Sequence, residues 1–400
     1  MKHLISRYFP IWLVAVTFST AFCQVYLSQA PQFAEAGQTV QVRAFADNHS
    51  TNVILAWISD TQNSSTEMVF KDGAWTAVIP AEAVQGTELS YTVTADDAQG
   101  TAASPDCTLY ICPAYTRLKP HTMALRQTIL AQATWNSNDS AFGLLKPENG
   151  PPVGPASIAY SKGSIYLLDS VNGRVLSFTR TGKPRPAMKI PTTDASDLVV
   201  DPTDNSLVVV SQLNDTIYRF RNGKLNRTQS VPLKKSFAYP AKFSYDRHTK
   251  TLYTRQQNRR DKKIAVTDRN TAGQTTAQSA PQDLNLQVVT EVQGNQLRLK
   301  LDNNPQIFSV EFQHPTGYVD EALIDDSGIV WILYTLQGDY RIRRLARIDT
   351  INATAETALI NVWFSFDATR RMTLTDNGVA LMTGDETQGR IIAFDYAGGL

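Results

Sequence analysis

Short stretches in which apolar and polar residues alternate follow one another along most of the chain, and turn residues separate them. Between residues 25 and 112 five such stretches are found: 40–45, 53–58, 66–70, 75–80 and 89–95. Alternation with a period of two places successive side chains on opposite faces of a strand. A spacing of roughly 10–15 residues between strands suits a β-sandwich. We therefore expect a sandwich over residues 24–112, with Trp57, Trp75 and Tyr91 filling its core.

From residue 154 to residue 400 a longer pattern recurs. Its clearest copy has an apolar strand, a glycine turn, a second strand, a polar turn and a third strand, and Phe178, Phe220 and Phe394 occupy matching positions in three copies. Six units of about 41 residues fit this region, and a four-stranded propeller blade needs about 40–45 residues. The sequence predicts an all-β protein in which the sandwich is followed by a six-bladed β-propeller.

Residues 113–153 break the alternation and contain five prolines. We interpret them as a connector between the two domains. Its apolar residues at 123, 125, 129, 130 and 135 are spaced so that they would share one side of a short helix.

The first 23 residues have the pattern of a signal peptide. Positively charged residues precede an apolar run at 9–18, and small residues favour cleavage after Ala21, with cleavage after Cys23 as the alternative. The run is too short for a membrane span. Phe22 is not the small residue that lipid attachment at Cys23 needs, so no lipid anchor is expected. The protein is expected to be exported, to the periplasm, the cell surface or the medium.

Cys107 and Cys112 form a possible disulfide, because exported proteins keep such bonds. Alternation places positions 107 and 112 on opposite faces of a strand, so a bridge requires a bend between them. Two thiols without a nearby histidine fall short of the four ligands of zinc.

The turn formed by Asp169, Asn172, Gly173 and Arg174 reads D-x-x-N-G-R, and Asn-Gly is the strongest signal for a tight turn between strands. We expect these residues to be structural, with Asp169 accepting bonds from the turn and Arg174 pairing with it.

Two resemblances add to this pattern. Gly154-Pro155, the stretch IYLLDSVNGRVLSF and Thr181-Gly182-Lys183 resemble repeats of NHL-type six-bladed propellers. The stretches KDGAWTAVIPA and GTELSYTVTADDAQG resemble Ig-like modules of exported bacterial proteins. The resemblances imply a fold and a general tendency to bind other molecules, rather than one particular catalytic activity. Such Ig-like modules usually serve as spacers or adhesion units.

The net charge and the motifs that are present or missing limit the classes of function that we expect. The formal net charge of +1, from 38 basic and 37 acidic residues, provides no field for nucleic acid. No histidine spacing suggests a metal site, and G-x-S-x-G is absent. Regucalcin-like propellers hold calcium with an early Glu, and the first two propeller units contain none.

We therefore expect no catalytic, cofactor-binding or metal-binding residues and no cofactor. The expected function is that of a non-enzymatic binding or scaffold protein at the cell envelope, whose propeller loops bind a protein or a glycan. The alternative is a hydrolase or lactonase that uses the central channel of the propeller.

Overall fold

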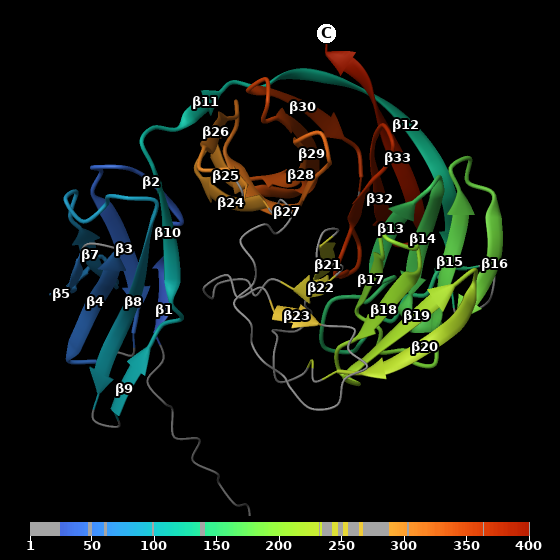
Figure 1. The fold of residues 1–400 in the computed structure, drawn as a ribbon, viewed down its shortest axis with the longest axis horizontal. Helices are drawn as coiled ribbons and strands as arrows, with labels where there is room; N and C mark the ends of the chain where they lie inside the picture. Colours follow the sequence, from blue (N-terminus) through green and yellow to red (C-terminus); the bar gives the residue numbers. More distant parts are fainter. Residues whose placement is uncertain are drawn as a thin grey trace, which may run out of the picture.

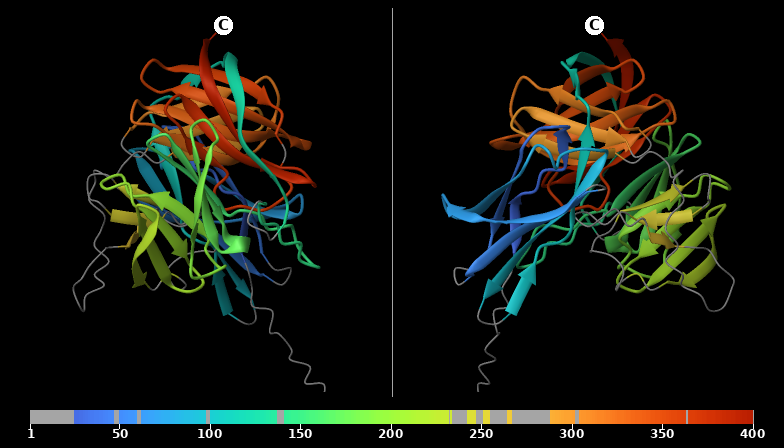
Figure 2. Two further views of the ribbon diagram at one scale, coloured as in Figure 1. Left: turned by 90° about the vertical axis from the view of Figure 1, so that its right-hand side faces the viewer. Right: turned by 60° about the vertical axis from the view of Figure 1, so that its left-hand side comes forward.

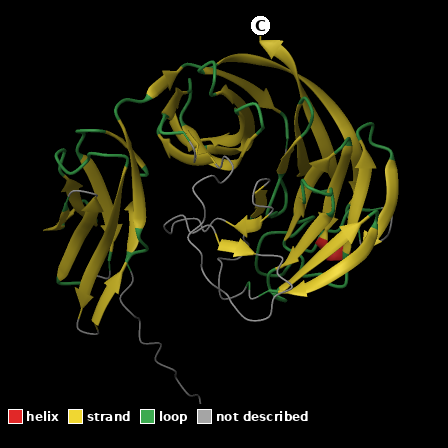
Figure 3. Ribbon diagram, in the orientation of Figure 1, coloured by secondary structure: helices red, strands yellow, loops and turns green. Residues whose placement is uncertain are grey.

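The chain folds almost entirely into strands in the computed structural model (Figures 1 and 3), which describes residues 25–46, 50–59, 62–97, 100–136, 141–231, 233, 242–246, 251–254, 264–266, 288–301, 304–362 and 364–399. In these ranges there are 33 strands and one 3-10 helix, η1 (Ser170–Asn172). The expected signal peptide and Cys23 lie outside the described residues. The prediction of an all-β protein is confirmed.

Two sheets form the N-terminal part, which stands apart at one side of the molecule in Figure 1. The first sheet has the order β1 (Tyr26–Gln29), β3 (Val40–Phe45), β7 (Ala74–Ile79), β6 (Val69–Lys71). The second has the order β2 (Phe33–Glu35), β10 (Cys107–Cys112), β8 (Glu88–Asp97), β4 (Asn52–Ser59), β5 (Asn63–Glu67), and β9 (Gly100–Ala103) pairs with β8.

Apolar side chains from both sheets share one core, as the alternation predicts. Trp57 and Tyr91 are 4% and 1% exposed, and Val42 of the opposite sheet is fully buried. Trp75 is only partly buried, although it packs against this core, and its ring meets Phe70 edge to face at 5.4 Å. It therefore lies at the edge of the core rather than inside it.

Five further sheets follow, and the largest has eight strands. We divide that sheet into two parts, sheets 5 and 6, and number all the units in chain order. Sheet 1 consists of β13 (Ser157–Ser161), β14 (Ser164–Asp169), β15 (Arg174–Thr179) and β16 (Pro184–Lys189). Sheet 2 consists of β17 (Asp197–Val200), β18 (Leu207–Ser211), β19 (Thr216–Arg221) and β20 (Lys224–Ser230). Sheet 3 consists of β21 (Phe243–Asp246), β22 (Thr251–Thr254) and β23 (Ile264–Val266).

The remaining sheets include strands from far away in the sequence. Sheet 4 consists of β24 (Val288–Gln293), β25 (Gln296–Leu301), β26 (Ile307–Glu311) and, beside β26, β11 (Thr116–Leu118). Sheet 5 consists of β27 (Thr316–Ile324), β28 (Ile329–Leu336), β29 (Asp339–Asp349) and β30 (Thr354–Ile360). Sheet 6 consists of β31 (Met372–Leu374), β32 (Gly378–Gly384), β33 (Gln388–Gly399) and, beside β33, β12 (His121–Thr134).

Separate apolar cores lie between neighbouring sheets. One core joins sheets 1 and 2, another sheets 2 and 3, and others join sheets 4 and 5, sheets 5 and 6, and sheets 6 and 1. The anchors Phe178, Phe220 and Phe394 are 8%, 1% and 2% exposed and lie on the third strands of sheets 1, 2 and 6. Sheets 4 and 5 curve around their common core like a nearly closed barrel (Figure 1).

Residues 116–134, which we call the strap, correct the expectation of a short helix. They form β11 and the 14-residue strand β12, and Figures 1 and 2 show β12 running along the outside of β33. At its first residues β12 also pairs with β30, so it joins sheets 5 and 6 into one eight-stranded sheet. The helical spacing misleads because backbone bonds to β33 outweigh local preference.

A small interface fixes the N-terminal sheets to sheet 4. The backbone N–H of Gln32 donates to Glu291 Oε1 over 2.9 Å, and Arg298 lies 3.3 Å from the other oxygen of Glu291. The Arg298 guanidinium also covers the ring of Tyr115 at 4.9 Å. Burial raises the pKa of Glu291. A desolvated carboxylate with these partners favours one fixed orientation of the two parts.

Candidate functional site

A cavity of about 590 Å³ opens where the first strands of several sheets converge. It is lined by residues of β13, β17, β21, β27 and β31, the first strands of sheets 1, 2, 3, 5 and 6. We call it the axial cavity. Its volume lies within the range of roughly 300–1,000 Å³ that is usual for small-ligand sites.

The buried carboxylate of Asp197 lies where three sheets and Arg370 of the cavity lining meet. Its Oδ1 accepts the hydroxyl of Ser157 at 2.7 Å and its Oδ2 accepts the backbone N–H of Phe243 at 2.7 Å. Arg370 pairs with it at 3.1 Å, and the N–H of Leu198 is another donor. Asp197 is completely buried. These partners come from β13, β17, β21 and the segment before β31, so one carboxylate joins the sheets around the cavity.

A second ionic cluster involves the middle of β27. Asp320 Oδ2 lies 2.8 Å from Arg343 Nε, and its other oxygen lies 3.7 Å from Arg371. Glu321 pairs with Lys242 at 2.9 Å. Burial raises the pKa of Asp320, while the two arginines act against that shift. The acids of this cluster are matched by cations, so the cluster holds sheets together rather than presenting a free charge.

The rim of the axial cavity is made of turns held by polar side chains. The Tyr160 hydroxyl donates to Asp376 Oδ2 at 2.5 Å and accepts the backbone N–H of Gly163 at 3.1 Å. Burial, with the nearby Asp376, raises the pKa of Tyr160 to about 12. Tyr245 also lines the cavity, and its hydroxyl accepts a hydrogen bond from Arg219 over 2.8 Å. The rim is therefore preorganised and carries aromatic rings and hydroxyl groups.

The buried acid beside the axial cavity is fully engaged by protein groups. Asp197 accepts five contacts from donors, whereas a carboxylate offers about four lone-pair sites, so its oxygens are fully occupied by protein groups. The residues that line the axial cavity include no histidine. In the part of the chain that the structure describes, no three His, Cys, Asp or Glu side chains gather as metal ligands.

The turn residues singled out in the sequence lie in sheet 1, next to the end of the connector. Asp169 is fully buried and accepts Arg174 Nε at 2.9 Å, Asn172 Nδ2 at 2.9 Å and the N–H of Gly143 at 3.0 Å. Gly173 follows η1 with φ +60°, the left-handed conformation that favours glycine. These residues stabilise the turn and do not line the axial cavity.

The possible disulfide is not formed in the structure. Cys107 and Cys112 are free thiols at the two ends of the continuous strand β10. Each lies near a backbone carbonyl, Cys107 Sγ at 3.7 Å from Pro105 and Cys112 Sγ at 3.8 Å from Ala34. Burial raises the pKa of both thiols, that of Cys112 to about 11. The bend that a bridge needs does not occur, because β10 pairs regularly with β8 and β2.

Sequence reasoning missed the residues at the axial cavity. Asp197 is the first residue of β17. Its signal was present, since it directly precedes the apolar run Leu198–Val200. Arg370 and Asp320 gave no comparable signal, because their partners lie on strands distant in the sequence. The basic residues at 234–235 and 259–263 lie outside the described residues.

Comparisons with known proteins give weak likenesses. No family model matches, and no curated protein matches. A streptogramin B lyase structure is 11% identical, with 93% of this chain and 98% of that chain covered and a TM-score of 0.24. Regucalcin from Agrobacterium tumefaciens is 11% identical, with 71% and 97% covered and a TM-score of 0.34. A DUF4221 family member from Bacteroides vulgatus is 7% identical, with 68% and 99% covered and a TM-score of 0.35.

Two other matched structures are much longer than the matched region. The chain spans 20% of an engineered protein and 63% of Kuenenia stuttgartiensis hydrazine synthase. These TM-scores are too low to support a conclusion about this chain. Separately, none of the helices in the described ranges is long and apolar enough to cross a membrane.

Proposed function

We propose that this chain is an exported, non-enzymatic binding protein in which an Ig-like sandwich carries a six-bladed propeller, and that the axial cavity binds the end of a glycan. One observation carries the proposal. The cavity has paired ionic groups and a rim of aromatic rings, hydroxyls and amides. Such a surface suits a neutral ligand rich in hydroxyl groups, because polar groups placed around an apolar cavity fix the orientation of a ligand.

The contacts between first strands support six blades. β13 lies beside β17 and β31, β17 lies beside β21, and β27 lies beside β24 and β31. These contacts link the first strands of six sheets in the order β24, β27, β31, β13, β17, β21, which supports a radial arrangement of the sheets. Radial repetition of this kind defines a propeller. The order of strands in sheet 6, with β12 from before sheet 1 beside β33, also fits a ring closed by both ends of the repeat region.

The interface between the sandwich and sheet 4 supports a scaffold role. Glu291, Gln32 and Arg298 tie the two parts together, and Phe33, Cys112 and Ile307 form a small apolar core beside them. A fixed sandwich holds the axial cavity at a set distance and angle from whatever the sandwich contacts. This arrangement is of use in a protein that presents a binding face at the cell envelope.

The alternative, a hydrolase or lactonase in the same cavity, needs a carboxylate that is free to act as a base or to hold a metal. Asp197 is saturated by donors, and Asp320 and Glu321 lie in ion pairs. Freeing Asp197 or Asp320 would leave the largely buried Arg370 or Arg343 without its carboxylate, which is costly. The described geometry therefore favours binding over catalysis.

The test uses an array of neutral oligosaccharides and the full chain. The wild-type protein is expected to bind a subset of the array. Thr373→Trp, which fills the axial cavity from β31, is expected to abolish that binding, while Thr228→Trp on the exposed outer strand β20 leaves it intact. Equal binding by Thr373→Trp, or none by the wild type, would contradict the proposal. Release of glycan fragments during incubation would favour the hydrolase.

A further inference from the structure

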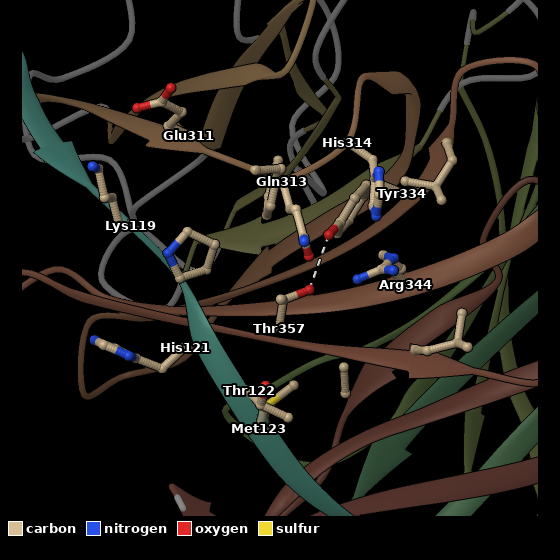
Figure 4. A pocket seen from close by; sticks show the side chains of 15 residues that line it. Lys119, His121, Thr122, Met123, Glu311, Gln313, His314, Tyr334, Arg344 and Thr357 are labelled. Carbon is tan, nitrogen blue, oxygen red and sulfur yellow. Dashed lines mark hydrogen bonds between the residues drawn. The ribbon is translucent and has the colours of Figure 1, made fainter.

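A second cavity lies away from the axis, under the strap. It has a volume of about 700 Å³ and lies between sheets 4 and 5, where the link between β11 and β12 passes over their edges. We call it the strap pocket. Figure 4 shows Gln313, His314, Tyr334 and Arg344 grouped in one part of it, with Lys119 and His121 on the strap across from them.

The interior of the strap pocket is built around a fixed chain of hydrogen bonds. The Thr357 hydroxyl donates to the backbone carbonyl of Leu345 at 3.2 Å, so in its 2.9 Å bond with Tyr334 it accepts the tyrosine proton. With its proton committed, Tyr334 presents only an acceptor to Arg344, which interacts with it. Tyr334 is fully buried. This series of hydrogen bonds fixes the Tyr334 hydroxyl, and its interaction with Tyr334 holds the Arg344 guanidinium at the pocket.

Arg344 retains unused capacity for hydrogen bonds. A guanidinium carries five N–H donors and stays charged. Its Nε is buried without a hydrogen-bond partner, and no carboxylate pairs with Arg344 in the part of the chain that the structure describes. By contrast, Arg343 and Arg347 on the same strand pair with Asp320 and Glu356. An arginine left without a carboxylate at a cavity is a suitable partner for an anion from outside.

The balance of charge in the strap pocket also favours an anion. Lys119 and Arg344 are cationic, and His121 and His314 add ring N–H donors, whereas Glu311 is the one carboxylate of the lining. Lys119, His121 and His314 are exposed, so they can reach a ligand at the mouth. The volume exceeds what a bare ion fills and fits a molecule the size of a small sugar.

We propose that the strap pocket is a binding site for a small organic anion, whose carboxylate or phosphate group pairs with Arg344 and whose polar body lies between sheets 4 and 5 beneath the strap. This site is separate from the axial cavity and does not depend on the glycan proposal. A ligand there contacts the strap and both sheets at once, so binding it also fastens the strap to the ring. Anything that binds the folded state alone raises its apparent stability.

Three probes distinguish the sources of the anion: inorganic phosphate, D-glucuronate, and D-glucose as the neutral counterpart of glucuronate. Thermal melts and calorimetric titrations of the full wild-type chain are expected to show saturable binding of phosphate or glucuronate, with a raised melting temperature, and none of glucose. Binding of phosphate alone assigns a phosphate-bearing ligand, and binding of glucuronate alone assigns a carboxylate-bearing one. Equal effects of glucose and glucuronate, or no saturable binding of either anion, overturn the proposal.

Variants locate the site. Arg344→Gln is expected to weaken binding of the active probe by about tenfold or more, as loss of a charge-assisted bond predicts. Gln313→Glu places a carboxylate in the pocket from an exposed position, so it should weaken binding without disturbing the fold. Arg126→Gln removes an exposed charge elsewhere on β12 and is the matched control. Unchanged binding by Gln313→Glu and Arg344→Gln, or equal weakening by Arg126→Gln, contradicts the site. Thr373→Trp should leave it unaffected.

Discussion

Sheets 1 and 2 differ from sheets 4 and 6 in where their strands come from. Sheets 1 and 2 each consist of four strands that follow one another in the sequence. Sheets 4 and 6 contain three such strands, and β11 and β12 complete them from a part of the chain that precedes all six sheets. The first kind is specified by local hairpins, and the second also depends on pairings between strands that lie far apart in the sequence. The difference shows that the repeated pattern specifies the local strands of each sheet, while the strap adds the long-range strands that complete sheets 4 and 6.

The strap is held by side chains as well as by backbone bonds. Leu130 is 8% exposed and packs with Ile158 and Phe178 of sheet 1, whereas Ile129 beside it is 52% exposed. β12 thus contributes to the core between sheets 6 and 1 while it pairs with β33. Four predictions follow from this comparison, ordered by the size of the expected effect.

Leu130→Ala is expected to lower the free energy of unfolding by about 3 kcal/mol, since it leaves a cavity in the core between sheets 6 and 1. Ile129→Ala, one residue earlier and exposed, is the control and should change it by less than about 0.5 kcal/mol. Urea denaturation followed by tryptophan fluorescence measures both. If the two variants cost the same, the strap does not pack as a structural strand, and the contrast between the two kinds of sheet is lost.

Gly182 and Gly223 give a sharper contrast, because they occupy the same kind of turn in sheets 1 and 2. Both have positive φ, +82° and +76°. A Cβ at Gly182 would collide with the backbone carbonyl of Leu130 in the strap, whereas one at Gly223 meets nothing within 4 Å. Gly223→Ala should cost about 1 kcal/mol from its backbone conformation alone.

Gly182→Ala should cost about 2–3 kcal/mol, because the strap must move in addition to the backbone strain. Thermal and urea melts of the two variants at one pH measure the difference. Equal costs would mean that the strap does not press on sheet 1. A larger cost at Gly223 would reverse the comparison altogether.

The sequence predicts those parts of this architecture in which strands pair with their neighbours in the sequence. Alternation and turn residues correctly indicate an all-β chain, and Phe178, Phe220 and Phe394 indeed occupy equivalent buried positions. The strap could not be predicted in this way. Its partners on β33 lie about as far along the chain as sequence separation allows, and a strand whose pairing is that distant leaves no periodic signal of its own.

The candidate sites also differ in whether their residues are close together or far apart in the sequence. The turn at Asp169 is local, and its hydrogen bonds to Asn172 and Arg174 could be inferred from the spacing of the residues. The pair of Asp197 with Arg370 and the pocket around Arg344 join residues from different sheets. Only the fold brings these side chains together, so no motif in the sequence marks them.

A third prediction concerns the contact of the N-terminal sheets with sheet 4. Arg298→Met leaves the buried carboxylate of Glu291 without its cation and should cost about 2 kcal/mol at neutral pH. Arg117→Met, which removes an exposed arginine 2.9 Å from Glu35 at the same junction, should cost less than about 1 kcal/mol.

The pH dependence of Arg298→Met follows from the pKa of Glu291, which burial raises and the cation of Arg298 opposes. Loss of the cation raises this pKa further. A raised carboxyl pKa costs stability above the folded pKa, and the cost disappears as the pH falls toward the unfolded value. The deficit of Arg298→Met relative to the wild type should therefore be largest at neutral pH and shrink on acidification. A deficit that grows toward acidic pH would contradict the assignment.

The smallest effects are expected at hairpin turns, where the two kinds of sheet should behave alike. Asp385 in the turn of sheet 6 accepts Thr387 Oγ1 at 2.6 Å and two backbone N–H groups, and these bonds, the Thr387 hydroxyl first, lower its pKa. For Asp349 in sheet 5, burial acts to raise the pKa, but bonds from Asn352 outweigh it and the pKa is lowered.

Asp385→Ala and Asp349→Ala should each cost about 1 kcal/mol at neutral pH. A lowered folded pKa gives stability above the unfolded value that is lost as the pH falls through the folded one, so both costs should shrink as the pH falls. Urea melts of each variant and the wild type at neutral pH and near pH ~3 measure this. A cost at Asp385 several times that at Asp349 would show that the pairing of the strap with β33 also affects the local turns of sheet 6.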